Sequence, residues 1–186
     1  MKEGRVFQNF DFPNRGTTPS ASSPWASLLA LIGFVGLCQL VGAAAAAVTV
    51  PSVRTWYLTL TAPPGTPPNW VFAPVWTTLY LLIGVSAWLV WRQAHRRIGI
   101  QAGHWGALRL WGWQLLAAAA WTPAFFGAHS PRLGLAVIGV MLVLIGCTIR
   151  AFARLNRLAA WLLAPYLAWT CYATYLNIGF WWLNPA

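Results

Sequence analysis

Five long apolar runs restrict the fold of this chain more than any other feature. They cover about residues 25–50, 70–91, 105–127, 133–153 and 158–180. A helix needs about 20 apolar residues to cross about 30 Å of hydrocarbon at about 1.5 Å per residue. Only 8% of the 186 residues are charged, whereas soluble domains carry roughly a quarter. The sequence therefore predicts an all-α integral membrane protein, a bundle of five transmembrane helices.

The predicted bundle occupies residues 24–186, and residues 1–23 are predicted to be a disordered polar tail. The tail contains both acidic residues of the chain, and its composition cannot bury a core. A signal peptide cut near Ala45 or Ala47 is the alternative to a first membrane helix. We favour the helix, because the apolar run is longer than a usual signal-peptide core and the tail before it is long.

The distribution of the 12 lysines and arginines agrees with five spans. If all five runs cross the membrane, ten of these residues lie on the side of the N-terminus, and only Arg54 and Arg132 lie on the other side. Positive residues accumulate on the cytoplasmic side. The sequence therefore predicts a cytoplasmic-membrane protein with its N-terminus inside and its C-terminus outside. Nucleic acid is not an expected partner, because the arginines alternate with membrane runs and do not form one basic face.

Several chemical groups are missing from the predicted bundle. It has no Asp or Glu, and the one lysine is Lys2 in the tail. His95, His104 and His129 lie in loops or at helix ends and share no helix face. Proton relays and ion-coupled transport usually need a carboxylate in the membrane. We therefore predict no metal site, no obligate cofactor and no conventional catalytic residue.

Aromatic residues recur at helical spacing in three of the runs. Phe72, Trp76 and Tyr80 are four residues apart, so they lie on one face of the second predicted helix. In the fifth, Trp169, Tyr172 and Asn177 fall at i, i+3 and i+8, near one face. Tryptophan and tyrosine walls with a few polar groups suit a flat, apolar ligand.

The third predicted helix carries Gln114, Trp121 and Phe125 at helical spacing. A buried glutamine or asparagine needs a hydrogen-bond partner. Gln114 and Asn177 are therefore expected to bond to each other or to carbonyl groups freed by proline, or to join neighbouring helices. The alanine run at 43–47 is predicted to be a small-residue face that lets helices approach closely.

Three stretches carry a family resemblance. The sequences WYLTLTAPPGTPPNWVFAPVWTTLY (56–80), WTPAFFG (121–127) and APYLAWTCYATYLN (164–177) resemble the TspO/MBR family of tryptophan-rich sensory and translocator proteins, which includes the peripheral benzodiazepine receptor. The order and spacing of these motifs hold over about residues 25–184. Their combination is specific, whereas each motif alone is weak.

The resemblance implies a five-helix bundle, often a homodimer, with a ligand pocket that opens toward the loop 51–69 and is lined mainly by the first, second and fifth helices. We predict that this loop is the lid of the pocket, because its prolines restrict the backbone. It implies protoporphyrin IX, haem and other flat apolar molecules as ligands. The predicted ligand-binding residues, from the resemblance and from helical spacing together, are Trp70, Phe72, Trp76, Tyr80, Gln114, Trp121, Pro123, Tyr166, Trp169 and Asn177.

The expected function is that of a membrane receptor or regulator that binds tetrapyrroles and affects their trafficking or level. Two alternatives stay open. One is light- or oxygen-dependent porphyrin degradation that uses Trp76 and Trp169, as the resemblance suggests. The other is facilitated transport of porphyrin or another apolar compound. An enzyme is the less favoured class, and the lipid bilayer is the expected environment.

Overall fold

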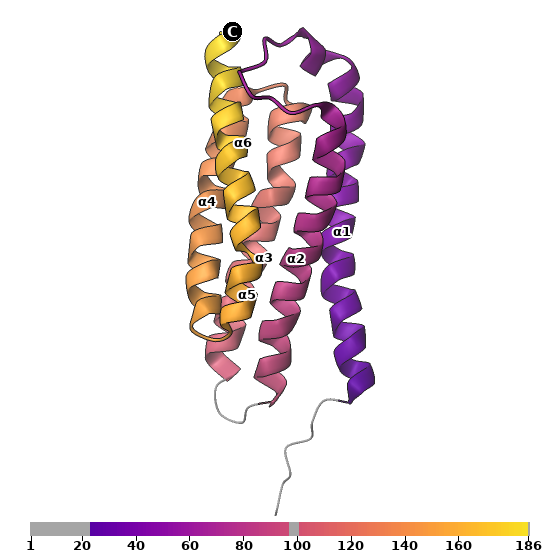
Figure 1. The fold of residues 1–186 in the computed structure, drawn as a ribbon, viewed down its shortest axis with the longest axis vertical. Helices are drawn as coiled ribbons and strands as arrows, with labels where there is room; N and C mark the ends of the chain where they lie inside the picture. The colour runs from indigo at the N-terminus through magenta and orange to yellow at the C-terminus, as the bar shows by residue number, and fades with distance from the viewer. Residues whose placement is uncertain (1–22, 97–100, 186) are drawn as a thin grey trace, which may run out of the picture.

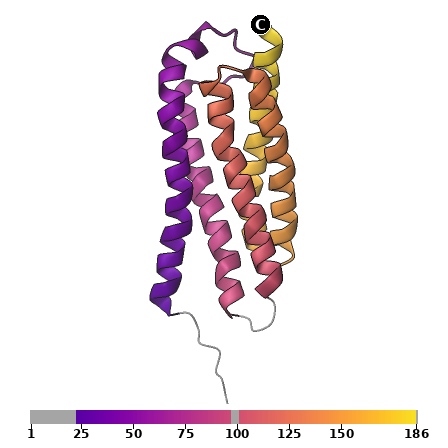
Figure 2. The same cartoon turned by 180° about the vertical axis from the view of Figure 1, so that it is seen from behind.

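The computed structural model describes residues 23–96 and 101–185, which form one helical bundle (Figure 1). The predicted tail at 1–23 lies almost wholly outside the described residues. The elements in chain order are α1 (Pro24–Arg54), η1 (Trp56–Thr59), α2 (Asn69–Arg96), α3 (Gln101–Thr122), η2 (Pro123–Gly127), α4 (Pro131–Ala153), α5 (Arg157–Leu162) and α6 (Ala164–Leu183). The long helices run side by side, and both views show the same arrangement (Figures 1 and 2).

Side-chain caps begin three of the helices. Ser23 accepts a hydrogen bond from the amide of Ala26 at the start of α1. Ser130 caps α4 and Asn156 caps α5 in the same way. In α1 and α4 a proline follows the cap directly, where its missing amide hydrogen removes no helical hydrogen bond. The Ser-Pro pairs in the sequence therefore mark where two helices begin.

The all-helical class is confirmed, but three of the predicted helices differ in detail. The fifth predicted helix, 158–180, is two helices that meet at Leu163. Pro165 follows this break and has no amide hydrogen to continue the helical bonding. The third predicted helix ends in the π-helical turn η2. The first helix is longer than predicted. The sequence predicts that it ends near residue 50, but α1 continues through Pro51 to Arg54, into the predicted loop 51–69.

The described residues include three helices that are long and apolar enough to cross a membrane, namely α1, α2 and α4. The helices α3 and α6 have 22 and 20 residues and lie in the same bundle. The end of the bundle that carries η1, the connection into α2 and Asn184 is called the loop end below; it is at the top of Figure 1.

The core of the bundle depends on close helix contacts. A methyl group added at Gly84 of α2 would lie 2.7 Å from the Cα of Val35 in α1. The absence of a side chain therefore lets these two backbones touch. Elsewhere in the interior, Ile83, Ile138 and Ile145 are buried with exposed fractions of 1% or less. A second aromatic cluster forms at the loop end around Phe125, Phe126, Leu176 and Phe180.

Candidate ligand cavity

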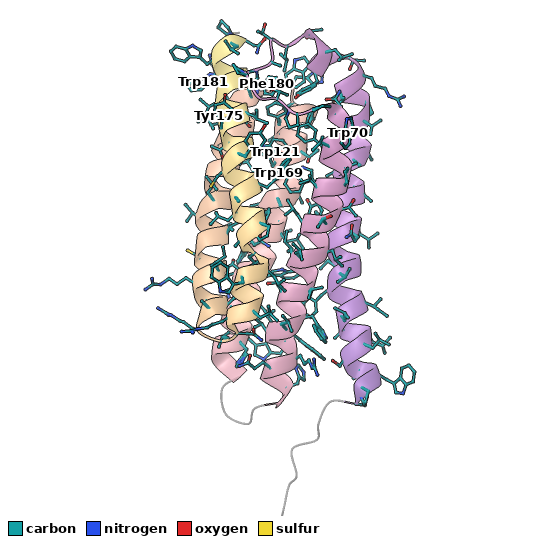
Figure 3. All side chains as sticks on the ribbon, in the orientation of Figure 1. Trp70, Trp121, Trp169, Tyr175, Phe180 and Trp181 are labelled. Atoms are coloured by element: carbon teal, nitrogen blue, oxygen red, sulfur yellow. The ribbon has the colours of Figure 1, made fainter. Side chains whose placement is uncertain are left out.

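A cavity of about 640 Å³ lies between α1, α2, α3, η2 and α6, toward the loop end. This volume falls within the roughly 300–1,000 Å³ of small-molecule sites. Trp121, Trp169 and Phe180 gather in that half of the bundle (Figure 3). The lining is mostly apolar, and Arg54 is its one charged residue among the described part of the chain.

One wall of the cavity is the predicted aromatic face of α2. Phe72, Trp76 and Tyr80 all line the cavity. The rings of Trp76 and Tyr80 have centroids 5.6 Å apart, and Phe72 meets Trp169 of α6 edge-on at 6.0 Å. Trp70 also lines the cavity, at its rim, with 74% of its surface exposed. The four-residue spacing in the sequence thus predicted this wall correctly.

The opposite wall comes from α3, η2 and α6. Trp121 stacks on Phe125 with centroids 5.3 Å apart, and both line the cavity. Asn177 is buried and donates from Nδ2 to the carbonyl of Pro131 at 2.6 Å. Its Oδ1 accepts a longer hydrogen bond from Nε1 of Trp121 at 3.4 Å. The amide of Asn177 therefore bonds to the carbonyl of Pro131 at the start of α4. The sequence predicts Gln114 or a carbonyl freed by a proline as its partner, and neither is the partner found.

The π-helical turn η2 delivers Phe125 and Phe126 to this wall. Both rings are buried and line the cavity. A π turn leaves its carbonyl groups out of the α-helical pattern, and the carbonyl of Phe126 accepts a hydrogen bond from Oγ of Ser52 at 2.9 Å. This buried bond ties the end of α1 to the turn. Next to it, Trp56 stacks on His129 at 4.8 Å, so His129 packs on an aromatic ring beside the cavity.

The third wall is the small-residue stretch of α1. Gly42, Ala43, Ala45, Ala46 and Thr49 line the cavity. The sequence interpretation treated the alanine run as a helix-packing face. In the fold, part of that run borders the cavity, and its short side chains leave room for a ligand. Small residues fit both roles, so spacing alone could not separate them.

Three predicted site residues lie outside the lining. Gln114 and Tyr166 are buried at 1% and 0% exposure. Each is adjacent in its helix to a lining residue, since Ala118 follows Gln114 by one turn and Trp169 follows Tyr166 by three residues. Neither the Gln114 amide nor the Tyr166 hydroxyl has a hydrogen-bond partner among the described residues. Pro123 is exposed and opens the π turn, so it shapes the wall without being part of it.

The predicted lid contains a proline-rich segment at 61–66 that is fastened to α6. The hydroxyl of Tyr172 donates to the carbonyl of Gly65, and that of Tyr175 donates to the carbonyl of Pro64. Asn184 donates to the carbonyl of Thr61 at 3.1 Å and accepts from its amide at 2.8 Å. A methyl group added at Gly179 would lie 2.5 Å from Pro63, so the absent side chain lets the proline seat on the helix.

The cavity offers mainly apolar and aromatic contacts. Its walls offer indole and phenyl faces, a few neutral polar groups and one guanidinium at the rim. Within the described residues no group of three His, Cys, Asp or Glu side chains is placed to hold a metal ion. Burial raises the pKa of Tyr57, which lines the cavity from η1, to about 12, so this phenol is neutral at ordinary pH.

The fold and the cavity define a class: a helical membrane protein with an aromatic-walled cavity at one end of its bundle. The family model for the TspO/MBR family matches residues 34–183. The chain belongs to this family.

Three relatives illustrate the match. The chain is 36% identical to the tryptophan-rich protein TspO of Chlorobaculum tepidum over 85% of this chain and 98% of that protein. It is 34% identical to the translocator protein of Bos taurus over 85% of this chain and 90% of the relative. It is 35% identical to the tryptophan-rich sensory protein of Cereibacter sphaeroides over 82% of this chain and 88% of that protein.

Proposed function

We propose that this protein binds a tetrapyrrole, such as protoporphyrin IX or haem, in the cavity and acts as a membrane receptor or regulator of that ligand. The observation that carries the proposal is that Trp76 and Trp169, from two different helices, line the same apolar cavity of about 640 Å³. Flat aromatic ligands gain from offset and edge contacts with such rings. Family membership supports the same conclusion.

Protoporphyrin IX titration in detergent tests the proposal. The readout is the absorbance of the porphyrin itself, because replacing tryptophans alters protein fluorescence. We expect the double variant Trp76→Ala/Trp169→Ala to bind at least about tenfold more weakly, since each ring contact contributes about 0.5–1.5 kcal/mol beyond buried area.

The matched control for this titration is Trp113→Ala/Trp161→Ala. These two tryptophans are 60% and 73% exposed and do not line the cavity. The control should bind like the unchanged protein. Equal affinity of the cavity variant and the control variant would refute the assigned site.

Porphyrin degradation is a second candidate, favoured by one observation. Nε1 of Trp169 is buried without a hydrogen-bond partner among the described residues, and the ring lines the cavity. An indole held in this way would sit directly against a bound flat ligand. Illumination of the complex should then bleach porphyrin absorbance faster than illumination of free porphyrin. Equal bleaching rates would leave binding as the function. Transport is tested separately, by porphyrin flux across proteoliposomes that contain the protein.

We also propose that the loop end faces the outside of a cytoplasmic membrane. Arg54 and Arg132 lie at this end, whereas Arg92, Arg150 and Arg154 belong to the opposite end. The positive-inside rule supports that orientation. A cysteine placed at Asn184 should react with a membrane-impermeant maleimide in intact cells, and reaction only after lysis would reverse the assignment. The homodimer stays a prediction from the family resemblance.

A further inference from the structure

Among the described residues, the exposed part of the cavity lining belongs to α1 and α2. The lining residues on α3, η2 and α6 are all buried or half-buried. On α1 and α2, by contrast, eight lining residues are exposed and form one stripe on each helix. The stripes are Ala43, Ala46, Val50 and Arg54 on α1, and Asn69, Trp70, Ala73 and Thr77 on α2.

The two stripes border an opening that runs along the helices, called the side slot below. Neighbouring members of the α1 stripe are three or four residues apart, so the stripe follows one face of the helix. From Ala43 to Arg54 the slot is about 16 Å long at 1.5 Å per residue. Half of the hydrocarbon thickness of a bilayer is about 15 Å. The slot therefore has the length of one leaflet, with Arg54 at the polar interface.

Contacts between α1 and α2 close the end of the slot toward the middle of the bundle. Toward the middle of the bundle, Nε2 of Gln39 in α1 donates to the carbonyl of Thr77 in α2 at 3.0 Å. Next to this bond, the ring of Tyr80 packs on Gly42. A methyl group added at Gly42 would lie 2.8 Å from Cδ2 of Tyr80. At the loop end, the segment 61–66 is bonded to α6. The exposed part of the cavity wall thus lies between α1 and α2.

We propose that the side slot is the route by which ligand reaches the cavity, directly from the hydrocarbon of the loop-end leaflet. This inference rests on the proposed function and adds the class of ligand: flat, apolar molecules that dissolve in the membrane. Such molecules concentrate in hydrocarbon because water disfavours their surface. The methyl side chains of Ala43, Ala46 and Ala73 keep the slot wide, and its hydrocarbon part carries no charge among the described residues.

The test places a bulky side chain in the slot and compares it with a matched position on the same helix. Ala46→Phe narrows the slot. Ala47→Phe adds the same ring at an exposed alanine that does not line the cavity. Each variant is reconstituted in phosphatidylcholine vesicles, and protoporphyrin IX binding is followed by stopped-flow quenching of tryptophan fluorescence. Equilibrium affinity is measured in the same vesicles.

A barrier on the path slows entering and leaving by the same factor. We expect Ala46→Phe to lower both rates about tenfold, equivalent to about 1.4 kcal/mol of added barrier. A lower off-rate distinguishes this barrier from weaker contact with the cavity wall, which would raise the off-rate. Ala47→Phe should leave both rates unchanged. In addition, the binding rate should follow the number of porphyrins per lipid, and diluting the vesicles at a fixed ratio should not alter it.

Three results would overturn the inference while leaving the proposed function intact: equal rates in the two variants, a change of the off-rate alone, or a binding rate that follows the aqueous porphyrin concentration. A second copy of the chain that covers the slot would also overturn it, and would appear as a change of oligomeric mass in Ala46→Phe by light scattering. Absence of equilibrium binding in the unchanged protein would refute the proposed function, and the side slot with it.

Discussion

The fastening of segment 61–66 to α6 leads to a quantitative prediction. Two tyrosine hydroxyls, on Tyr172 and Tyr175, donate to the carbonyl groups of Gly65 and Pro64. The double variant Tyr172→Phe/Tyr175→Phe removes both hydroxyls and keeps both rings. A hydrogen bond of this kind contributes about 0.5–1.5 kcal/mol net. Losing two therefore favours detachment of the segment by ~2 kcal/mol, or about 30-fold in population.

Hydrogen exchange measures that population. Four of the residues between Thr61 and Pro68 are prolines and lack an amide, so a peptide over 60–70 reports on few positions, with Thr61 and Thr66 prominent. The amide of Thr61 is bonded to Asn184 and that of Thr66 to Pro63. Deuterium uptake there should accelerate about 30-fold in the double variant, in line with ~2 kcal/mol.

The core of α4 provides the internal control, because Ile138, Met141 and Ile145 are buried on a different helix from the two tyrosines. Uptake there should not change. If uptake at 60–70 stayed as in the unchanged protein, the tyrosine hydroxyls would not hold the segment, and the reasoning from hydrogen bonds would be refuted. Since the side slot is the proposed route of the ligand, the variant should also bind porphyrin at an unchanged rate.

Two further predictions concern packing and pH. Gly84→Val should lower the free energy of unfolding by ~1–3 kcal/mol through overpacking against the α1 backbone. The control Gly139→Val, with open space around the added Cβ, should not lower it. Equal melting temperatures of the two variants in detergent would contradict the close contact. Tyr57 has a raised pKa of about 12 because of burial, against about 10 when unfolded, so its stabilising contribution is complete below about pH 10 and is lost as pH rises toward 12. Melting temperatures from pH 9 to 12 should therefore fall less steeply in Tyr57→Phe, and parallel curves would show that this phenol does not carry the pH dependence.

The sequence by itself determined the class of protein, its helical spans and one wall of its site. Apolar runs of membrane length leave the backbone no alternative to a helix or a closed barrel, since every amide and carbonyl in lipid must be bonded internally. The spacing of Phe72, Trp76 and Tyr80 fixes which face of α2 is aromatic, because helix geometry is local. The same reasoning put Trp169, Tyr172 and Asn177 on one face of α6. Trp169 and Asn177 line the cavity with the three α2 rings, whereas Tyr172 lies outside the lining and bonds to Gly65.

Only the tertiary structure decided what each face meets. Gln114 follows the same spacing as Trp121, yet it is buried beyond the cavity, because α3 continues past the end of that space. Asn177 finds the carbonyl of Pro131, a partner 46 residues away, which helical spacing cannot identify. The alanines of α1 border the cavity together with the aromatic face of α2. Which two helix faces stand opposite each other is set by the packing of the whole bundle, and periodicity within one helix has no information about it.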